Sequence, residues 1–428
     1  MSFNKKTIRD IHLDGKQILL RADYNVPIND GHITDDYRIK QSLPTIEYLL
    51  DRHCSIVVCS HLGRPDGKRD EKYSLAPIAK RLSKLLDKPV QFADDCIGPE
   101  VEKQVKALEP GQLLLLENVR FHPEEEANDA GFAKQLATYG DIFVQDAFGV
   151  VHHGAVSVSE LPKYMPGVAG LLLEKEVDAI TSVMENPKRP LMAIIGGAKI
   201  SDKIEFLERF IELADFVAIG GAMANTFLLA EGIHTGHSLT EPEDVKMAKH
   251  LLDKARAKAK SGHFTFYLPQ DGVVAKKIDK TSHTRIVDWQ AHVIADVEAY
   301  PKRPQREAST IQPDESVLDI GPFSGAFIAG GIQLANTVVW NGAMGVTETP
   351  ALVGPIGPFA HGTELVIEAM TGQFGHRPYS LVGGGDTVGY IEARGEVKFF
   401  DHVSTGGGAS LELMSGKKLP GVEALQNK

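Results

Sequence analysis

Short apolar runs alternate with longer amphipathic stretches along the whole chain. Runs of four or five apolar residues are typical of strands buried in a parallel sheet, and helical spacing between such runs predicts βαβ units. The pattern therefore predicts an α/β protein with parallel sheets flanked by helices. The runs are Gln17–Leu20, Ser55–Cys59, Leu113–Leu116, Ile142–Val144, Leu191–Ile195, Phe216–Ile219, Val317–Ile320, Thr337–Trp340, Ser380–Val382 and His402–Val403.

A turn-rich break at Leu161–Gly167 divides this alternation and is followed by a helical pattern over Leu171–Met184, which ends at Asn186–Pro187. The chain has 428 residues, and a single core stops growing at about 250–300 residues. We therefore expect two domains, residues 1–170 and 187–414, joined by an interdomain helix over residues 171–186. The alternative is that this helix only packs on the first sheet.

In the first half, the residues that follow the apolar runs are rich in cations. Ligands of parallel sheets bind beyond the carboxyl ends of the strands, so we expect these side chains at one rim. Arginine suits bidentate capture of phosphate or carboxylate, and the set predicts a small phosphorylated acid as ligand. The alternative is that each arginine pairs with a neighbouring acid. The rim residues are Arg21, His61, Arg64, Arg120 and the pair His152–His153, with Arg38 nearby.

In the second half, the apolar runs end in glycine. Residues Gly383–Gly385 are followed by Asp386 and a helix-compatible stretch, and Gly196–Gly197, Gly220–Gly221 and Gly342 follow other runs. Glycine lets backbone N–H groups approach a ligand, and a helix N-terminus favours phosphate. Several such turns at one sheet edge predict a polyphosphate site. The alternative is that these turns only let helices pack close to the sheet.

Four polar side chains near these turns refine the prediction. Lys199 and Lys203 lie one helical turn apart, so both can face the same anion. Asp386 is the one acid in its turn and suits a Mg²⁺ ion shared with phosphate oxygens. Glu348 follows another glycine turn and suits ribose hydroxyls. Neither the G-x-x-x-x-G-K-[ST] nor the G-x-G-x-x-G nucleotide motif is present.

Charge and cysteine content narrow the function classes. The net charge of −11 argues against nucleic-acid or membrane-surface binding. The three cysteines show no metal-type spacing and favour a reducing compartment. No apolar run approaches the length of a membrane span, and the N-terminus lacks the apolar core of a signal peptide. We expect a cytoplasmic monomer.

One half suited to an acid phosphate and another suited to a nucleotide point to phosphoryl transfer between two bound ligands. Such transfer depends on positioning and charge neutralisation. A carboxylate acceptor is already ionised at neutral pH and needs no general base. This agrees with a chain that shows no obvious pair of nucleophile and base.

Ordered motifs along nearly the whole chain resemble the phosphoglycerate kinase family. They are RADYNVP (21–27), the helix start at Arg38, SHLGRP (60–65), ENVRFHPEEE (117–126), QDAFG (145–149), GGAKISDKI (196–204), GGAMANTFL (220–228), LDIGP (318–322), VVWNGAMGV (338–346), GGGDT (383–387) and HVSTGGGASLELM (402–414). The resemblance implies two Rossmann-like domains with a hinge helix and an active-site cleft between them. The tail, residues 415–428, resembles a segment that returns to the first domain.

The same resemblance implies the glycolytic and gluconeogenic reaction ATP + 3-phosphoglycerate ⇌ ADP + 1,3-bisphosphoglycerate, with Mg²⁺. It assigns catalysis to Arg38, Lys199 and Lys203. The implied substrate-binding residues are Asp23, Tyr24, Asn25, Arg38, His61, Leu62, Gly63, Arg64, Arg120 and His153. The implied nucleotide-binding residues are Lys203, Gly221, Glu348, Gly384, Gly385, Asp386 and Thr387, with Asp386 also ligating the metal.

The chain departs from the family pattern at residues 150–155, which read VVHHGA. His153 stands where the family has a phosphate-contacting arginine. Histidine is only partly charged at neutral pH, so we expect weaker phosphate binding above about pH 7. Ala343 and Phe323 replace a usual proline and lysine, and the polar excursion over residues 280–313 is longer than expected.

Two rival functions follow from these departures. One is a kinase that phosphorylates another carboxylate, although the arginines favour a phosphorylated acid. The other is a catalytically impaired homologue that only binds nucleotide, supported by the altered segment at residues 150–155. The retained Arg38, Lys203 and Asp386 argue against the second rival.

Overall fold

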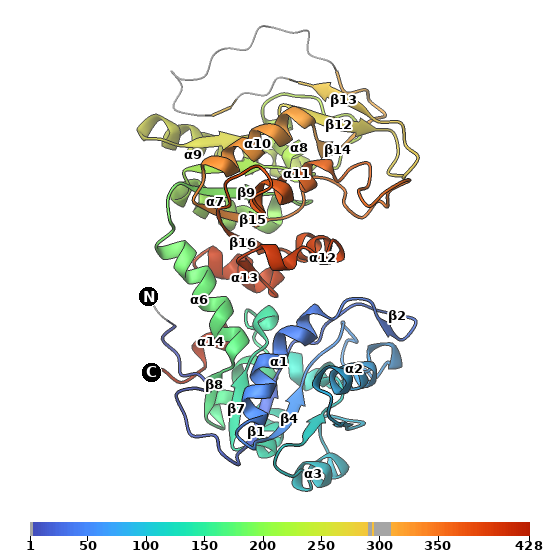
Figure 1. Ribbon diagram of the computed structural model, residues 1–428, viewed down its shortest axis with the longest axis vertical. Coiled ribbons are helices and arrows are strands. Elements are labelled where there is room, and N and C mark those ends of the chain that lie inside the picture. The colour runs from blue at the N-terminus through green and yellow to red at the C-terminus, as the bar shows by residue number, and fades with distance from the viewer. Residues whose placement is uncertain (1–2, 290–292, 295–309) are drawn as a thin grey trace. The chain divides into compact units, whose positions relative to one another are not determined.

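The computed structural model of the chain describes residues 3–289, 293–294 and 310–428, and Figure 1 shows its ribbon. The chain separates into two compact units. Unit 1 comprises residues 1–181 and 405–428, and unit 2 comprises residues 182–404. Each unit is described by itself below.

Unit 1 is a parallel α/β sandwich. Its described strands form a six-stranded sheet in the order β5-β6-β4-β1-β7-β8, and every pair is parallel. The strands are β1 (Gln17–Arg21), β4 (Ser55–Cys59), β5 (Val90–Phe92), β6 (Leu113–Leu115), β7 (Ile142–Gln145) and β8 (Gly167–Ala169), with a small hairpin of β2 (Ile28–Asn29) and β3 (His32–Ile33). The helices are α1 (Tyr37–Leu50), α2 (Ala76–Leu86), α3 (Pro99–Lys106), α4 (Pro123–Glu126), α5 (Ala130–Leu136), α6 (Leu171–Glu185), α13 (Gly407–Met414) and α14 (Pro420–Glu423).

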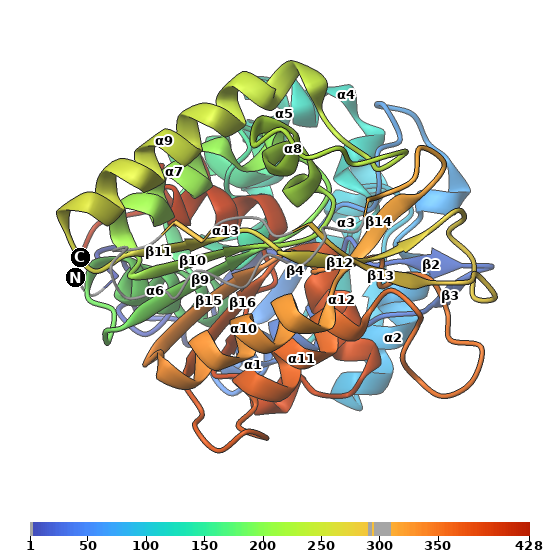
Figure 2. The same ribbon diagram turned by 90° about the horizontal axis from the view of Figure 1, so that it is seen from above.

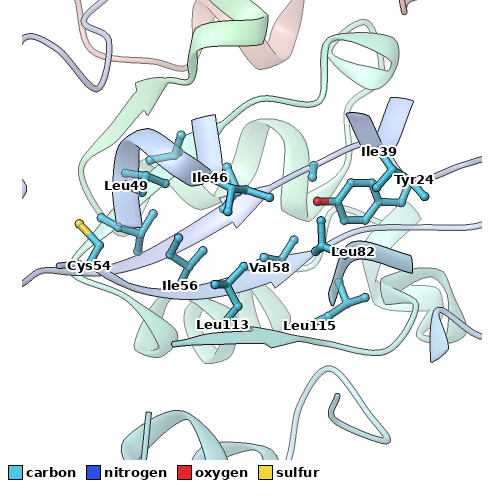
Figure 3. Close-up of a cluster of buried hydrophobic side chains, with 14 of the residues drawn as sticks. Tyr24, Ile39, Ile46, Leu49, Cys54, Ile56, Val58, Leu82, Leu113 and Leu115 are labelled. Carbon is cyan, nitrogen blue, oxygen red and sulfur yellow. The ribbon is translucent and has the colours of Figure 1, made fainter. Parts of the chain in front are cut away.

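The core of unit 1 lies between this sheet and helices α1 and α2. Successive strand residues point to opposite faces of a sheet, so Ile56 and Val58 of β4 face the same way. Ile46 of α1 and Leu82 of α2 pack against them in one buried cluster, which Figure 3 shows. All four side chains are fully buried. Removal of this apolar surface from water is the main force that holds the helices on the sheet.

The two ends of the chain meet in unit 1, as Figure 1 shows. Lys5 and Asn427 form an isolated β-bridge, and the N–H of Lys6 donates to the carbonyl of Gln426. The tail therefore lies beside the N-terminal segment. Helix α13 also groups with unit 1, whereas the sequence placed residues 405–414 in the second domain. The physical reason is its packing, since a Cβ on Gly408 would meet the ring of His152.

Helix α6 begins where a buried carboxylate caps it. Asp146 follows β7, and its Oδ1 accepts from the N–H groups of Leu172 (2.9 Å) and Leu173 (3.1 Å). Burial raises the pKa of Asp146 to about 7. The predicted interdomain helix is present over Leu171–Glu185, and the boundary between the units falls within it at 181/182.

Unit 2 repeats the parallel architecture. Its described strands form a six-stranded sheet in the order β11-β10-β9-β15-β16-β17. Figure 2 shows α7, α8 and α9 on one side of this sheet and α10 and α11 on the other. The strands are β9 (Leu191–Ile195), β10 (Phe216–Ile219), β11 (Thr265–Tyr267), β15 (Thr337–Asn341), β16 (Tyr379–Gly383) and β17 (His402–Val403). The helices are α7 (Ile204–Leu213), α8 (Met223–Ala230), α9 (Val245–Ser261), α10 (Pro322–Leu334), α11 (His361–Met370) and α12 (Gly385–Ala393).

A separate antiparallel sheet corrects one strand prediction. Strand β14 (Ser316–Ile320), expected with the parallel strands, instead pairs antiparallel with β12 (Asp271–Ala275), which also pairs with β13 (Arg285–Asp288). The predicted polar excursion over residues 280–313 therefore contains a strand, and its residues 290–292 and 295–309 lie outside the described residues. A short apolar run does not reveal its pairing partner.

None of the helices that the structure describes is both long enough and apolar enough to cross a bilayer. The three cysteines, Cys54, Cys59 and Cys96, are free and buried.

Candidate active site

The first group of site residues lies in the loops that leave the carboxyl ends of β1 and β4. Arg38 of α1 donates from Nη1 to Asp23 Oδ2 (3.1 Å) and to the carbonyl oxygen of Asn25 (3.1 Å). Asn25 Oδ1 in turn accepts from the N–H of Gly63 (2.9 Å). These contacts join the two loops and fix the guanidinium of Arg38 by one of its nitrogens. The other nitrogens of the guanidinium are left for a ligand.

Charge around Asp23 keeps this carboxylate ionised although it is buried. Burial on its own would raise the pKa of Asp23, but Arg38, His61 and Arg21 outweigh it and hold the pKa below its ordinary value. Asp23 is therefore an anion beside the charges of Arg38 and Arg21. Its position suits acceptance of a hydrogen bond from a ligand hydroxyl rather than binding of a second anion.

Two further arginines, Arg64 and Arg120, add positive charge to this group of site residues. Arg64 is exposed and makes neither an ion pair nor a hydrogen bond within the described residues. Arg120 donates from Nη1 to the carbonyl of Gly63 (2.9 Å) and pairs through Nε with Glu126 (3.2 Å). Asn118 holds the same loop, because its amide donates to the carbonyl of Leu62 (2.8 Å). The loop after β4 is thus fixed by the loop after β6.

Arg21 and His61 are buried side chains that lie beneath the first group of site residues. Arg21 is 2% exposed and donates from Nε to Ser157 Oγ (2.8 Å), while its Nη2 lies 3.2 Å from His61 Nδ1. Burial, followed by the charge of Arg21, lowers the pKa of His61 well below its usual value. His61 is therefore neutral at pH 7. Arg21, which the sequence predicts at the rim of strand ends, is buried there, because the end of β1 turns its side chain inward.

Two predicted binding residues point their side chains into the core. The Tyr24 ring is fully buried, as Figure 3 shows, and its hydroxyl lies 3.0 Å from Ser42 Oγ. Leu62 is 5% exposed. The side chain of neither residue is available to a ligand. Gly63 adopts φ +63°, and a Cβ there would meet the ring of Tyr73, so the turn requires glycine.

The altered segment after β7 places two histidine rings against each other. The ring centroids of His152 and His153 lie 3.8 Å apart. Burial, and then the neighbouring His153, lower the pKa of His152 to about 4. Burial, and then the charges of Arg120 and Arg64, lower the pKa of His153 as well, despite Glu412 and Glu126. The pH at which His153 loses its charge therefore lies below its ordinary pKa of about 6.5 in the ligand-free chain.

In unit 2, glycine turns follow β9, β10 and β15 and pack directly on one another. Gly342 adopts φ +99°, and a Cβ there would lie 2.2 Å from the carbonyl oxygen of Gly196. Gly221 adopts φ +64°, and a Cβ there would lie 2.5 Å from the nitrogen of Gly197. Only glycine permits both the backbone conformation and the close approach. The three loops therefore form one compact surface of backbone groups.

Lys203 lies within this surface. Its ammonium donates to the carbonyl of Gly196 (2.7 Å), the carbonyl of Asn341 (3.2 Å) and Asn341 Oδ1 (2.7 Å). Burial lowers the pKa of Lys203 to about 8, although Asp386 and Asp202 act in the opposite direction. Lys199 is exposed and has no hydrogen bond or ion pair among the residues that the structure describes. One lysine is thus held in place and the other is free to reach a ligand.

The N-terminus of α12 completes the second group. Gly384 precedes this helix with φ +96°, and the space around a Cβ on Gly385 is open. Asp386 is exposed in the first turn. Thr387 is fully buried, and its Oγ1 accepts from the N–H of Gly342 (3.0 Å), so its hydroxyl links α12 to the loop after β15. The free N–H groups of the first turn make this end suitable for phosphate.

Glu348 lies further along the chain after β15, and it is exposed and makes no hydrogen bond or ion pair among the described residues. Its carboxylate is available to hydroxyl donors. Asn118, Asn341 and Ser157, which hold Leu62, Lys203 and Arg21, were not among the predicted site residues. Asn118 and Asn341 do stand inside the motifs ENVRFHPEEE and VVWNGAMGV, and the motif membership was the available signal.

Unit 2 also contains a cavity that none of these site residues lines. It measures about 740 Å³ and is lined at the amino ends of the strands by Leu191, Phe216 and Thr265, together with Phe327 and Leu334 of α10. Ligands of open parallel sheets bind at the carboxyl ends of the strands. The glycine turns, and not this apolar cavity, therefore lie where such a sheet binds ligands.

The comparison with known proteins covers almost the whole chain. Residues 8–417 match the family model described as phosphoglycerate kinase. The phosphoglycerate kinase of Moorella thermoacetica is 44% identical over 424 residues, covering 99% of this chain and 100% of that protein. That of Chloroflexus aurantiacus is 45% identical over 427 residues, covering 99% of each.

Solved structures agree with this result. Phosphoglycerate kinase from Coxiella burnetii superimposes with a TM-score of 0.79 at 35% identity, covering 98% of both chains. The enzyme from Pyrococcus horikoshii OT3 superimposes with a TM-score of 0.81 at 29% identity, again covering 98% of both. The matched region includes the arginines of unit 1, the two lysines of unit 2 and the glycine turns. The chain belongs to the phosphoglycerate kinase family.

Proposed function

We propose that this chain carries out the reaction of its family with the residues of unit 1 binding 3-phosphoglycerate. Arg38 contacts the acid from the side of the transferring group. Asp23 and Asn25 accept from the glycerate hydroxyl and help to orient it. The phosphate end is bound by Arg64, Arg120 and His153, with the backbone of residues 61–63 and the buried Arg21 as support.

We propose that unit 2 binds ATP at the glycine turns. Lys203 and Lys199 neutralise the phosphates, and the N–H groups at Gly384–Thr387 cradle them. Gly221 gives the nucleotide close access to the backbone, and Glu348 accepts from the ribose. Asp386 is the residue suited to hold Mg²⁺, because its exposed carboxylate makes no hydrogen bond or ion pair among the described residues and Mg²⁺ commonly takes one carboxylate plus phosphate oxygens. The ion neutralises phosphate charge when bound.

The chemistry needs little more than these charges. The carboxylate of 3-phosphoglycerate is ionised at neutral pH, so it attacks the γ-phosphorus without a general base. Charge builds on the oxygens of the transferred group, and Arg38 and Lys203 are the fixed cations that stabilise it. The observation that carries the proposal is the Lys203 ammonium, held against backbone oxygens of glycine turns beside the open end of α12.

The assay that tests this function measures ATP-dependent phosphorylation of 3-phosphoglycerate with and without Mg²⁺. We expect turnover that requires both. A panel of other carboxylates in the same assay tests the rival kinase, and no turnover of any acid would support the impaired homologue. Nothing in the site supports impairment, because Arg38, Lys203 and Asp386 are all retained.

The His153 position gives a pH prediction. Protonated His153 favours phosphate, and its lowered pKa means that this charge is present only below about 6.5 and is lost as the pH rises. His153→Arg keeps the charge at every pH. At pH 8 we expect the KM for 3-phosphoglycerate to fall roughly 5- to 10-fold in this variant, the difference between a neutral and a charge-assisted hydrogen bond.

The matched control for this prediction is His153→Gln, because phosphate itself titrates near pH 6. The ratio of KM values of His153→Gln and wild type cancels the titration of the substrate. We expect the ratio to exceed one below about pH 6 and to approach one at pH 8. A ratio that stays constant from pH 5.5 to pH 8, together with an unchanged KM in His153→Arg, would contradict the role of His153.

We further propose that bound ligands bring the two units together, since the acid site and the nucleotide site belong to different units. Hinge closure of this kind excludes water and completes a catalytic site. Small-angle scattering should show a smaller radius of gyration with 3-phosphoglycerate and a nonhydrolysable ATP analogue than with either ligand alone. An unchanged radius would contradict closure. We propose a monomer acting in the cytoplasm.

A further inference from the structure

A cluster of three different metal-binding side chains lies in unit 1 outside the groups described above. Asp95 and Cys96 follow β5, and His122 follows β6. One donor atom from each, a carboxylate oxygen, the thiol sulfur and a ring nitrogen, all lie within 4.8 Å of one another. Cysteine spacing in the sequence gives no sign of this site, because the histidine comes from another loop.

The fold brings these residues together because β5 and β6 are neighbours in the parallel sheet. The loops that leave adjacent parallel strands meet at one edge. His122 Nε2 lies 2.6 Å from Asp95 Oδ1, and the His122 ring stacks on Phe132 with centroids 5.5 Å apart. The ring is therefore held with its Nε2 toward the cluster. Cys96 is fully buried beneath it.

A second observation also points into the cluster. The Tyr139 side chain is 1% exposed, and its hydroxyl has no hydrogen-bond partner among the described residues. The ring lies near the cluster, since Cys96 and Asp95 are among the groups whose charges reach it, and the backbone of Gly98 is also close to its hydroxyl. A buried polar group without a partner is costly. A water molecule on a bound ion would give this hydroxyl a partner.

From this geometry we propose that Asp95, Cys96 and His122 bind one divalent cation of borderline softness, with Zn²⁺ as the natural occupant. A sulfur, a nitrogen and an oxygen donor with an open fourth position form a tetrahedral site of the kind that Zn²⁺ adopts. Bond lengths of about 2.0–2.3 Å place tetrahedral donors roughly 3.3–3.7 Å apart. The three donor atoms lie within 4.8 Å of one another, so they need to move by about 1 Å to bind the same ion.

Binding would exchange protons for the ion. The thiol and the ring nitrogen that faces Asp95 must both be deprotonated to act as ligands. The buried Cys96 thiol releases its proton to solvent as the metal–sulfur bond forms, and the hydrogen bond between His122 and Asp95 is replaced by two metal bonds. The ion would link the loop after β5 to the loop after β6.

Cobalt provides the test, because Co²⁺ replaces Zn²⁺ and is visible. The untagged full-length protein is titrated with Co²⁺ alone. We expect one equivalent to produce a sulfur-to-cobalt charge-transfer band in the near ultraviolet with visible bands of tetrahedral intensity, and Zn²⁺ to abolish them. No charge-transfer band at saturating Co²⁺ would overturn the proposal.

Variants assign the ligands. Cys96→Ser should lose the charge-transfer band, and His122→Asn should weaken Co²⁺ binding about 100-fold or more. Cys54→Ser is the matched control, because Cys54 is also a buried thiol, donates to the carbonyl of Leu13 and should leave the band unchanged. If Cys96→Ser does not fold, His122→Asn and Asp95→Asn decide the question. Unchanged Co²⁺ affinity in both of these folded variants would overturn the proposal.

Discussion

Replacement of Lys203 by alanine should lower kcat about 10²- to 10³-fold, which is the usual effect of removing one preorganised donor to developing charge. The ammonium is positioned by Gly196 and Asn341, so no neighbouring side chain can take its place. Lys199 is exposed and carries no such contacts. Steady-state kinetics with ATP and 3-phosphoglycerate provide the measurement.

Folding should be nearly unaffected by this change. The alanine variant loses hydrogen bonds but is also relieved of a buried charge, so we expect its melting temperature to lie within a few degrees of wild type. Lys249→Ala, at an exposed position of α9, is the control and should keep full activity. Equal activity of Lys203→Ala and wild type would remove Lys203 from the mechanism.

The pKa of Lys203 predicts that activity falls at alkaline pH. Its pKa of about 8 in the ligand-free chain means that the cation is present below this value and is lost as the pH rises through it. The kcat/KM for ATP reports ionisations of the free enzyme and should therefore fall above pH 8. A profile that stays flat to pH 9.5 would show that the neutral amine suffices.

Replacement of Arg38 by alanine should have the largest effect of any change in unit 1. Arginines that stabilise a transferring phosphoryl group are worth about 10³-fold or more in kcat. Arg38 also holds Asp23 and the carbonyl of Asn25, so the KM for 3-phosphoglycerate should rise as well. Loss of Arg38 should raise the pKa of Asp23, because burial raises this pKa and the charge of Arg38 is the largest effect that lowers it.

Two variants make the result specific. Arg38→Lys keeps the charge but not the planar fork, so it should recover only part of the activity of wild type. Arg52→Ala removes a guanidinium that lies over the Tyr48 ring, 3.5 Å from its centroid, and should leave kcat unchanged. If Arg38→Lys matched wild type, the geometry of the guanidinium would be irrelevant and only its charge would count.

The candidate site shows which features could be predicted before the fold was known. The sequence singled out residues that follow apolar runs, and Asp23, Asn25, Arg38, Gly63 and Arg120 do lie in one connected network. The same rule did not show that Arg21 is buried, and the family resemblance did not show that the Tyr24 side chain is buried. Both side chains turn into the interior. The direction of a side chain at a strand end depends on the pleat and on the turn that follows, and neither is visible in residue order.

Longer-range relations were less predictable still. The partner of β14 is an antiparallel strand that the apolar pattern did not indicate. The contacts of Thr387 and Asn341, which tie α12 and Lys203 to the loop after β15, depend on the order of strands in the sheet. The cluster of Asp95 with His122 depends on the adjacency of β5 and β6. Such contacts exist only once separate segments have packed together.

The sequence by itself determined the α/β alternation, the residues available at the strand ends and the family, because period, glycine placement and motif order are local properties. The tertiary structure alone decided which cations are exposed, which lysine is held and which is free, and where the pKa values of His153 and Lys203 lie. Burial and neighbouring charge set those properties, and both come from residues distant in the chain.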